Sequence, residues 1–166
     1  MLWFSPDPRG VLDFKDFHVP ASLRKLKRKR SDWIFTINRK TSEVIRQCRL
    51  QPRKGQPGTW ILPEMEAAYQ ALAKEGHILS LEVWDKEALV GGIYGVYIEG
   101  EKGRFFSGES MFHTETGASK LCLWQLVEHL NAQGLSWIDT QMVTDVVKLM
   151  GGKYIPREDF LKRLGV

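Results

Sequence analysis

The chain is poor in the residues that usually indicate a metal centre, a disulfide framework or a membrane span. It has two cysteines in 166 residues, Cys48 and Cys122, far apart in the sequence. We expect both to be reduced residues of the core. The four histidines lack the spacing of metal ligands, so we expect neither a metal nor a cofactor. No apolar run approaches the ~20 residues that cross a bilayer, and no secretion signal is visible. The sequence therefore predicts a cytoplasmic globular protein without a membrane partner.

Several common catalytic motifs are also missing. No Ser-His-Asp order, P-loop or GxGxxG motif is present. A pyrophosphate-binding glycine-rich signature that opens a helix, as an acyl-CoA-dependent N-acetyltransferase would need, is not convincing either. That class of enzyme remains an alternative that the sequence supports poorly.

Positive charge is concentrated in the first third of the chain. Residues 1–60 hold 14 Lys and Arg against 5 Asp and Glu, whereas residues 61–166 hold 10 against 15. A local excess of this kind indicates a polyanionic partner. Proline and leucine spacing predicts a helix over 20–30, in which six of the last seven residues are cationic: Arg24, Lys25, Lys27, Arg28, Lys29 and Arg30. A solvated charged face is the alternative, but no acidic partner lies within the run, so we expect contact with a nucleic-acid backbone.

The remaining pattern predicts an α+β domain. We expect short strands at 11–14 and 33–38, helices at 41–49 and 63–75, and a helix cap at Thr41 or Ser42. Three antiparallel strands follow at 78–84, 88–98 and 104–111, and the glycines of the middle strand indicate a bulge or a close backbone approach. A helix over 117–131, a strand over 135–142, a helix over 144–150 and a tail complete the chain. The expected fold is a mixed, mainly antiparallel sheet flanked by helices.

The segment "LSWIDTQM" (135–142) places polar groups in a strand that otherwise looks buried. Strand alternation puts Trp137, Asp139 and Gln141 on one face. Together, the carboxylate and the amide could hold or orient an amine. Alternatively, both could satisfy backbone groups at a strand end.

Two further sites have both a structural and a functional interpretation. Glu109 follows Gly108, which permits a bulge, and a buried carboxylate there needs either a structural salt bridge or a substrate amine as its partner. Trp60 and Tyr69 are either an ordinary pair of core aromatics or a platform on which a base stacks.

Several stretches together resemble the leucyl/phenylalanyl-tRNA–protein transferase family. They are "LWFSPDPRGVL" (2–12), the basic helix, residues 58–96, "FFSGESMF" (105–112), "GASK" (117–120), "IDTQ" (138–141) and "IPREDFL" (155–161). The resemblance covers essentially the whole chain. It implies one catalytic domain over 1–166, with a basic, RNA-facing portion (1–60) and an acyl-CoA N-acyltransferase (GNAT)-like core (61–166).

The resemblance also implies an activity and a set of site residues. Such enzymes move leucine or phenylalanine from aminoacyl-tRNA to the N-terminal Arg or Lys of a protein, which marks that protein for degradation. Asp139 and Gln141 match the catalytic acid and amide, with Asp139 orienting and polarising the amide, and Glu109 matches a residue near the amine of the esterified amino acid. The side-chain pocket is matched by Ile93, Phe106, Leu123 and Ile138, the terminal adenosine site by Trp60 and Tyr69, and the acceptor-stem site by the six cations of the basic helix. We expect a monomer.

Three departures from the family pattern keep other functions open. We expect the chain to lack the N-terminal region that family members carry, Ile93 stands where methionine is common, and Thr144 and Val146 stand where asparagine and histidine are usual. One alternative is a compact relative that uses another aminoacyl carrier or acceptor. The other is a non-catalytic RNA-binding remnant.

Overall fold

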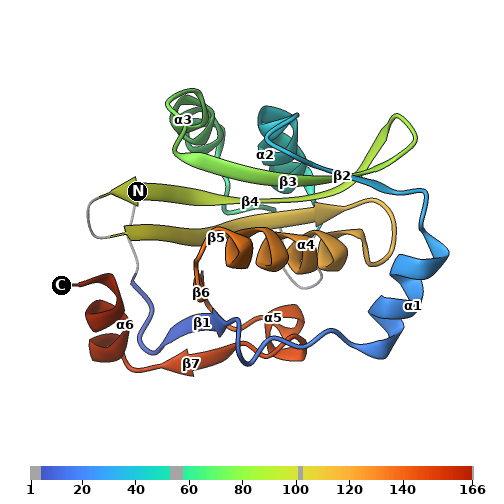
Figure 1. Cartoon of the computed structure of the whole chain (residues 1–166). Coiled ribbons are helices and arrows are strands. Elements are labelled where there is room, and N and C mark those ends of the chain that lie inside the picture. The colour runs from blue at the N-terminus through green and yellow to red at the C-terminus, as the bar shows by residue number, and fades with distance from the viewer. Residues whose placement is uncertain (1–4, 53–57, 101–102, 166) are drawn as a thin grey trace.

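One sheet, with strand order β2-β3-β4-β5-β6-β1-β7, forms the centre of the molecule (Figure 1). The computed structural model describes residues 5–52, 58–100 and 103–165. The strands of this part are β1 (Arg9–Asp13), β2 (Ile34–Ile37), β3 (Ile78–Asp85), β4 (Ala88–Gly100), β5 (Gly103–His113), β6 (Trp137–Gln141) and β7 (Lys153–Ile155). The helices are α1 (Ala21–Lys29), α2 (Thr41–Leu50), α3 (Pro63–Lys74), α4 (Ala118–Ala132), α5 (Asp145–Leu149) and α6 (Arg157–Leu164).

The sheet is mixed and mainly antiparallel, as the sequence predicts. The β2–β3–β4–β5 pairs and both neighbours of β1 are antiparallel, and β6 runs parallel to β5. Both strands from the basic first third of the chain, β1 and β2, belong to this same sheet. The described part of residues 1–60 therefore contributes two strands to the central sheet.

Helices cover both faces of the β2–β5 half of the sheet. Figure 1 shows α2 and α3 on one face and α4 on the other. The stripe that predicts α4 is buried as expected, with Leu123, Leu126, Val127 and Leu130 all 4% exposed or less. At Gly91, a Cβ atom would lie 2.7 Å from the Cβ of Ala118 in α4. This glycine therefore permits the close approach of helix and strand that the sequence indicates.

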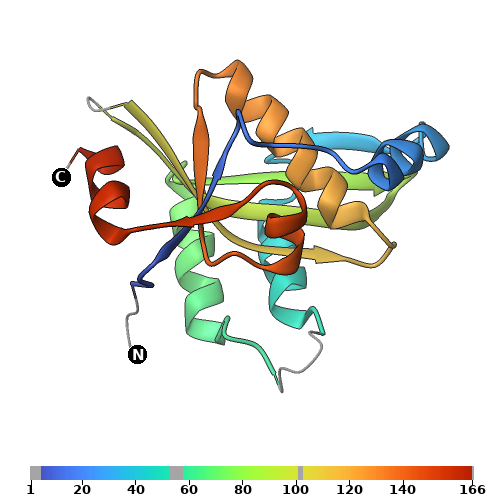
Figure 2. The ribbon, with the colours of Figure 1, turned by 90° about the horizontal axis from the view of Figure 1, so that it is seen from below.

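The other half of the molecule is built around β6, β1 and β7. A small apolar cluster of Val11, Ile155 and Phe160 joins β1 and β7 to α6. In Figure 2, α1 and α6 lie at opposite ends of the molecule. No helix in the described ranges is long and apolar enough to cross a membrane.

Some local expectations need correction. Neither Thr41 nor Ser42 caps α2: the cap is Lys40, with no side-chain hydrogen bond, and the Thr41 hydroxyl instead pairs with Ser80 at 2.8 Å. The segment expected to be a tail forms β7 and α6. Both cysteines are buried core residues that form no disulfide, as expected. Residues 2–4 of the first matching motif lie outside the described residues.

Candidate active site

The polar residues predicted for the site meet where β5 and β6 separate. Within the described residues, these strands are joined by a single pairing, Ser107 with Asp139. On the other side of β5, Gly108 pairs with Gly95 and Ser110 with Tyr94, so Glu109 is an extra residue opposite no partner. This is the β-bulge that Gly108 was expected to permit. The bulge and the diverging strands together leave room for side chains between β5 and β6.

Asp139 is 1% exposed and all of its lone-pair directions are used. Arg9 donates from Nε to Oδ1 at 2.9 Å and from a terminal nitrogen to Oδ2 at 2.7 Å. The Ser107 hydroxyl donates to Oδ2 and the main-chain N–H of Gln141 to Oδ1, both at 2.9 Å. A buried carboxylate is tolerated when a bidentate guanidinium and further donors compensate it. The Asp139 carboxylate is therefore held in one orientation by four hydrogen bonds and is not available as a free base.

Gln141 adopts a left-handed backbone conformation at the end of β6, with φ of 61°. Its Nε2 lies 3.3 Å from Glu109 Oε1, 3.4 Å from the Gly108 carbonyl oxygen and 3.5 Å from Ser107 Oγ. These distances are at the long end for hydrogen bonds, so the carboxamide is oriented but not tightly held. The predicted link between the acid and the amide exists, but Asp139 bonds the main chain of Gln141 rather than polarising its side chain.

Glu109 is a partly buried carboxylate. The Tyr69 hydroxyl donates to it at 2.7 Å, and within the described residues it forms no salt bridge. Burial raises the pKa of Glu109, and hydrogen bonds from Tyr69 and Gln141 offset only part of that effect. Burial and the same carboxylate also raise the pKa of Tyr69. Of the two partners foreseen for Glu109, the structural salt bridge is therefore not found in this part of the chain.

The four residues predicted to line an amino-acid pocket do come together. Ile93, Phe106, Leu123 and Ile138 belong to one apolar cluster between α4 and the sheet. Each is 6% exposed or less, so in this conformation they are packed core residues. Ile138 directly precedes Asp139 in β6, so the two side chains point to opposite faces of the strand.

The two aromatic residues predicted to bind adenosine have different environments. Tyr69, on α3, packs edge-on against Tyr94 at 5.4 Å between ring centroids, in addition to its bond to Glu109. Trp60 is 43% exposed. The core-pair interpretation therefore fits Tyr69 but not Trp60, whose indole is available to a partner.

The basic helix α1 divides into paired and exposed cations. Lys27 lies 3.8 Å from Glu128 and over the ring of Trp124, and Arg30 lies 3.2 Å from Glu115. These partners come from other elements, which sequence spacing within the helix could not reveal. The other four cations are exposed, and none forms a salt bridge within the described residues: Arg24, Lys25, Arg28 and Lys29.

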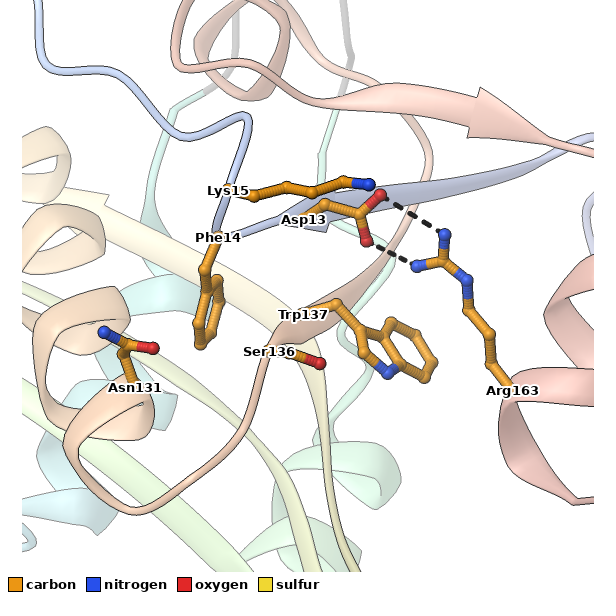
Figure 3. Close-up of a pocket in the computed structure, with 7 residues that line it drawn as sticks. All are labelled: Asp13, Phe14, Lys15, Asn131, Ser136, Trp137 and Arg163. Carbon is orange, nitrogen blue, oxygen red and sulfur yellow. Dashed lines mark hydrogen bonds and ion pairs between the residues drawn. The ribbon is translucent and has the colours of Figure 1, made fainter.

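A hollow of about 720 Å³ lies away from this polar cluster, beside the opposite end of β6 (Figure 3). It is lined by Asp13, Phe14, Lys15, Asn131, Ser136, Trp137 and Arg163. Figure 3 shows Asp13 and Arg163 joined by two hydrogen bonds, of 2.5 and 3.2 Å. Burial alone would raise the pKa of Asp13, but the bonds from Arg163 and Lys153 hold it below its usual value.

Sequence reasoning missed Arg9 and Ser107. Both stand in motifs that were singled out, Arg9 within "LWFSPDPRGVL" and Ser107 within "FFSGESMF". Two observations could have indicated Arg9: a buried carboxylate such as Asp139 needs a cationic partner, and Arg9 lies just before the strand predicted at 11–14. The pairing of β1 with β6, which places Val11 opposite Asp139, could not be read from the sequence.

Comparison with known structures defines the fold first. The fold is that of GCN5-related N-acyltransferases: the GCN5-related glucosamine N-acetyltransferase region of a fungal multi-domain β-N-acetylglucosaminidase aligns with a TM-score of 0.60. That alignment covers 90% of this chain and 20% of the fungal chain at 10% identity, so it establishes the fold alone.

The sequence then defines the family. The family model described as leucyl/phenylalanyl-tRNA protein transferase matches residues 11–165, and the chain belongs to this family of aminoacyltransferases. It is 43% identical over 164 residues to the leucyl/phenylalanyl-tRNA–protein transferase of Shewanella baltica (strain OS155), covering 99% of this chain and 67% of the relative. It is 46% identical over 164 residues to that of Pseudoalteromonas atlantica, covering 99% of this chain and 68% of the relative.

Proposed function

We propose that this chain transfers leucine or phenylalanine from an aminoacyl-tRNA to the N-terminal Arg or Lys of an acceptor protein, which marks that protein for degradation. The reaction is attack of the acceptor α-amine on the carbonyl carbon of the aminoacyl ester. A new amide bond forms, the ester C–O bond breaks, and the ribose oxygen leaves with a proton. The observation that best supports this function is the group of Asp139, Gln141 and Glu109 at the opening between β5 and β6.

Glu109 is suited to bind the amine of the esterified amino acid. It is partly buried, forms no salt bridge with the described residues and lies 3.3 Å from Gln141. An ammonium group would supply the missing charge and make burial of the carboxylate less costly. The same contact would place the ester beside the Gln141 carboxamide.

Gln141 is suited to orient the attacking amine. Its nitrogen is turned toward Gly108, Glu109 and Ser107, which leaves the amide oxygen to accept a hydrogen bond from the incoming N–H. An amide is a weak base, so its contribution is placement of the nucleophile, with the proton passing to the leaving ribose oxygen through substrate or water. Asp139 contributes by fixing the main chain of Gln141.

The remaining predicted contacts complete the proposal. The cluster of Ile93, Phe106, Leu123 and Ile138 would border the leucine or phenylalanine side chain, and admitting that side chain requires these residues to separate. Trp60 would stack on the terminal adenine beside Tyr69. The exposed cations of α1 would contact phosphates of the acceptor stem without reading sequence.

Transfer of label from tRNA to peptide tests this function. The chain is incubated with leucyl- or phenylalanyl-tRNA carrying a labelled amino acid and a peptide that begins with Arg; the control peptide is identical but N-acetylated. We expect label in the free peptide alone. If label stays on the tRNA while the chain still binds RNA in a salt-sensitive way, the non-catalytic RNA-binding function is favoured. The apolar cluster favours this second function, because its residues are packed together where the leucine or phenylalanine side chain would have to bind.

A further inference from the structure

Arg9 connects the candidate site to the C-terminal helix. Its guanidinium makes both of its bonds to Asp139 on one side and lies 4.7 Å from the ring centroid of Phe160, in α6, on the other. Its side chain is 14% exposed. A guanidinium that forms a fork with a buried carboxylate and stacks on an aromatic ring has little freedom to reorient.

Asp139 accepts four hydrogen bonds, two from Arg9 and two from groups of the candidate site. Each carboxylate oxygen accepts one bond from Arg9 and one from a group of the site: Oδ1 from the Gln141 main chain, and Oδ2 from the Ser107 hydroxyl. The plane of the guanidinium therefore sets the plane of the carboxylate. That plane in turn sets where Gln141 and Ser107 lie.

Gln141 needs such support because of its backbone. Its φ of 61° is in the left-handed region, which a residue with a side chain rarely adopts unless its surroundings hold it there. The main-chain bond to Asp139 holds this residue at the end of β6, together with the pairing of Gln141 with Gly10 of β1.

We infer that Arg9 is a positioning residue for the transfer reaction, and that α6 acts on the site through it. This inference rests on the proposed function. Arg9 need not touch substrate: it fixes Asp139, and Asp139 fixes the backbone turn that aims the Gln141 carboxamide. Phe160 keeps the guanidinium in place.

The molecule contains a matched control for this arrangement. Arg163 also pairs through two hydrogen bonds with a buried aspartate of the same sheet, Asp13, and lies 5.2 Å from the ring centroid of Trp137. It likewise ties α6 to β1. The bonds recorded for Asp13, however, come from Arg163 and Lys153 and not from a site residue. Loss of Arg163 should thus affect stability as loss of Arg9 does, without moving Gln141.

The test compares Arg9→Lys and Arg9→Ala with Arg163→Lys and Arg163→Ala. Lysine keeps the charge but not the fork. We expect the Arg9 variants to lower kcat for transfer by about 100-fold, the scale of a misplaced reacting group, with KM for aminoacyl-tRNA within twofold of the parent. The Arg163 variants keep the parental kcat. Added guanidinium partly restores Arg9→Ala and does nothing for Arg163→Ala.

A second readout is independent of turnover. In ¹⁵N-labelled protein, the side-chain and main-chain amide signals of Gln141 should shift in both Arg9 variants and stay in place in both Arg163 variants. If the parent transfers nothing but these shifts occur, the proposed function fails, and what stands is that Arg9 positions Gln141. If the folded Arg9 variants keep the parental kcat and the parental Gln141 signals, the inference is overturned. Should Arg9→Ala not fold, Arg9→Lys decides by the same criteria.

Discussion

The two regions that the sequence singled out, α1 and the polar cluster around Asp139, differ in how their polar groups are satisfied. In α1 four cations are exposed and have no salt bridge among the described residues. Around Asp139, by contrast, each carboxylate oxygen has two donors and the residue is 1% exposed. One region presents charge to solvent, and the other holds charge within a fixed geometry.

This difference predicts different responses to conditions. Exposed charges are screened over about 8 Å at physiological ionic strength, so a function of α1 should weaken with salt. Buried and fully bonded groups are screened much less, so the polar cluster should respond to substitution and to pH instead. Substitutions in one region should therefore change binding, and substitutions in the other should change the rate of transfer.

The largest effect is expected from Asp139→Asn. The variant leaves Arg9 without its anion and gives the Gln141 turn a weaker acceptor, so transfer should fall about 1000-fold. Affinity for RNA should stay at the parental value, because α1 lies elsewhere. Single-turnover transfer and RNA binding measure the two quantities. Asp159→Asn is the control, since Asp159 pairs with Lys162 on the exposed surface of α6.

The next effect concerns α1 and compares two double variants, each of which removes two positive charges. Arg28→Gln with Lys29→Gln removes exposed cations, and should lower affinity for tRNA by about 30-fold at physiological salt and reduce the salt slope by about 2. Lys27→Gln with Arg30→Gln removes cations that already have carboxylate partners, so its effect should be smaller. Binding measured over a range of salt concentrations checks this. Equal losses in the two double variants would contradict the division of α1.

Trp60→Ala should have a smaller effect that involves both regions. If the exposed indole stacks on the terminal adenine, its loss should weaken binding of aminoacyl-adenosine about tenfold. The salt slope for tRNA should not change, because no cation is removed. Titration with an aminoacyl-adenosine mimic gives the affinity. Unchanged binding of the mimic would show that the indole has another role.

The smallest effect is a pH dependence of stability in Glu109→Gln. Because burial raises the pKa of Glu109 in the folded state, its stabilising contribution is full below the unfolded pKa and is lost as pH rises through the folded pKa. Glu109→Gln should thus become more stable relative to the parent as pH rises from 4 toward 7. Asp13, whose pKa is lowered, has the opposite sign: its contribution is lost as pH falls. Denaturant unfolding between pH 4 and pH 7 measures the Glu109 effect, and unfolding at pH values below the ordinary pKa of 3.8 measures the Asp13 effect.

Much of the fold could be predicted because its signals are local. The apolar stripe of α4 and the short turns of the β3–β4–β5 meander lie within a few residues of one another. The segments β7 and α6, with 3 and 8 residues, are too short for such a pattern. Their positions are determined by packing against β1, where Phe160 meets Val11.

The sequence indicated several residues of the site, but not which distant residues form hydrogen bonds with them. The polar residues in a buried strand pointed to Asp139 and Gln141, and Gly108 pointed to the bulge at Glu109. The partners of these groups come from distant segments: Arg9 is 130 residues from Asp139, and Tyr69 is 40 from Glu109. Sequence spacing carries no information on such contacts, which arise only when β1 and α3 are placed in the fold.

The most direct test of the account is the single-turnover rate of phenylalanine transfer to an Arg-peptide by Gln141→Ala at saturating phenylalanyl-tRNA. If the carboxamide orients the attacking amine, this rate falls at least about 100-fold while affinity for the charged tRNA stays within twofold of the parent. A folded Gln141→Ala variant that transfers phenylalanine at the parental rate would contradict it.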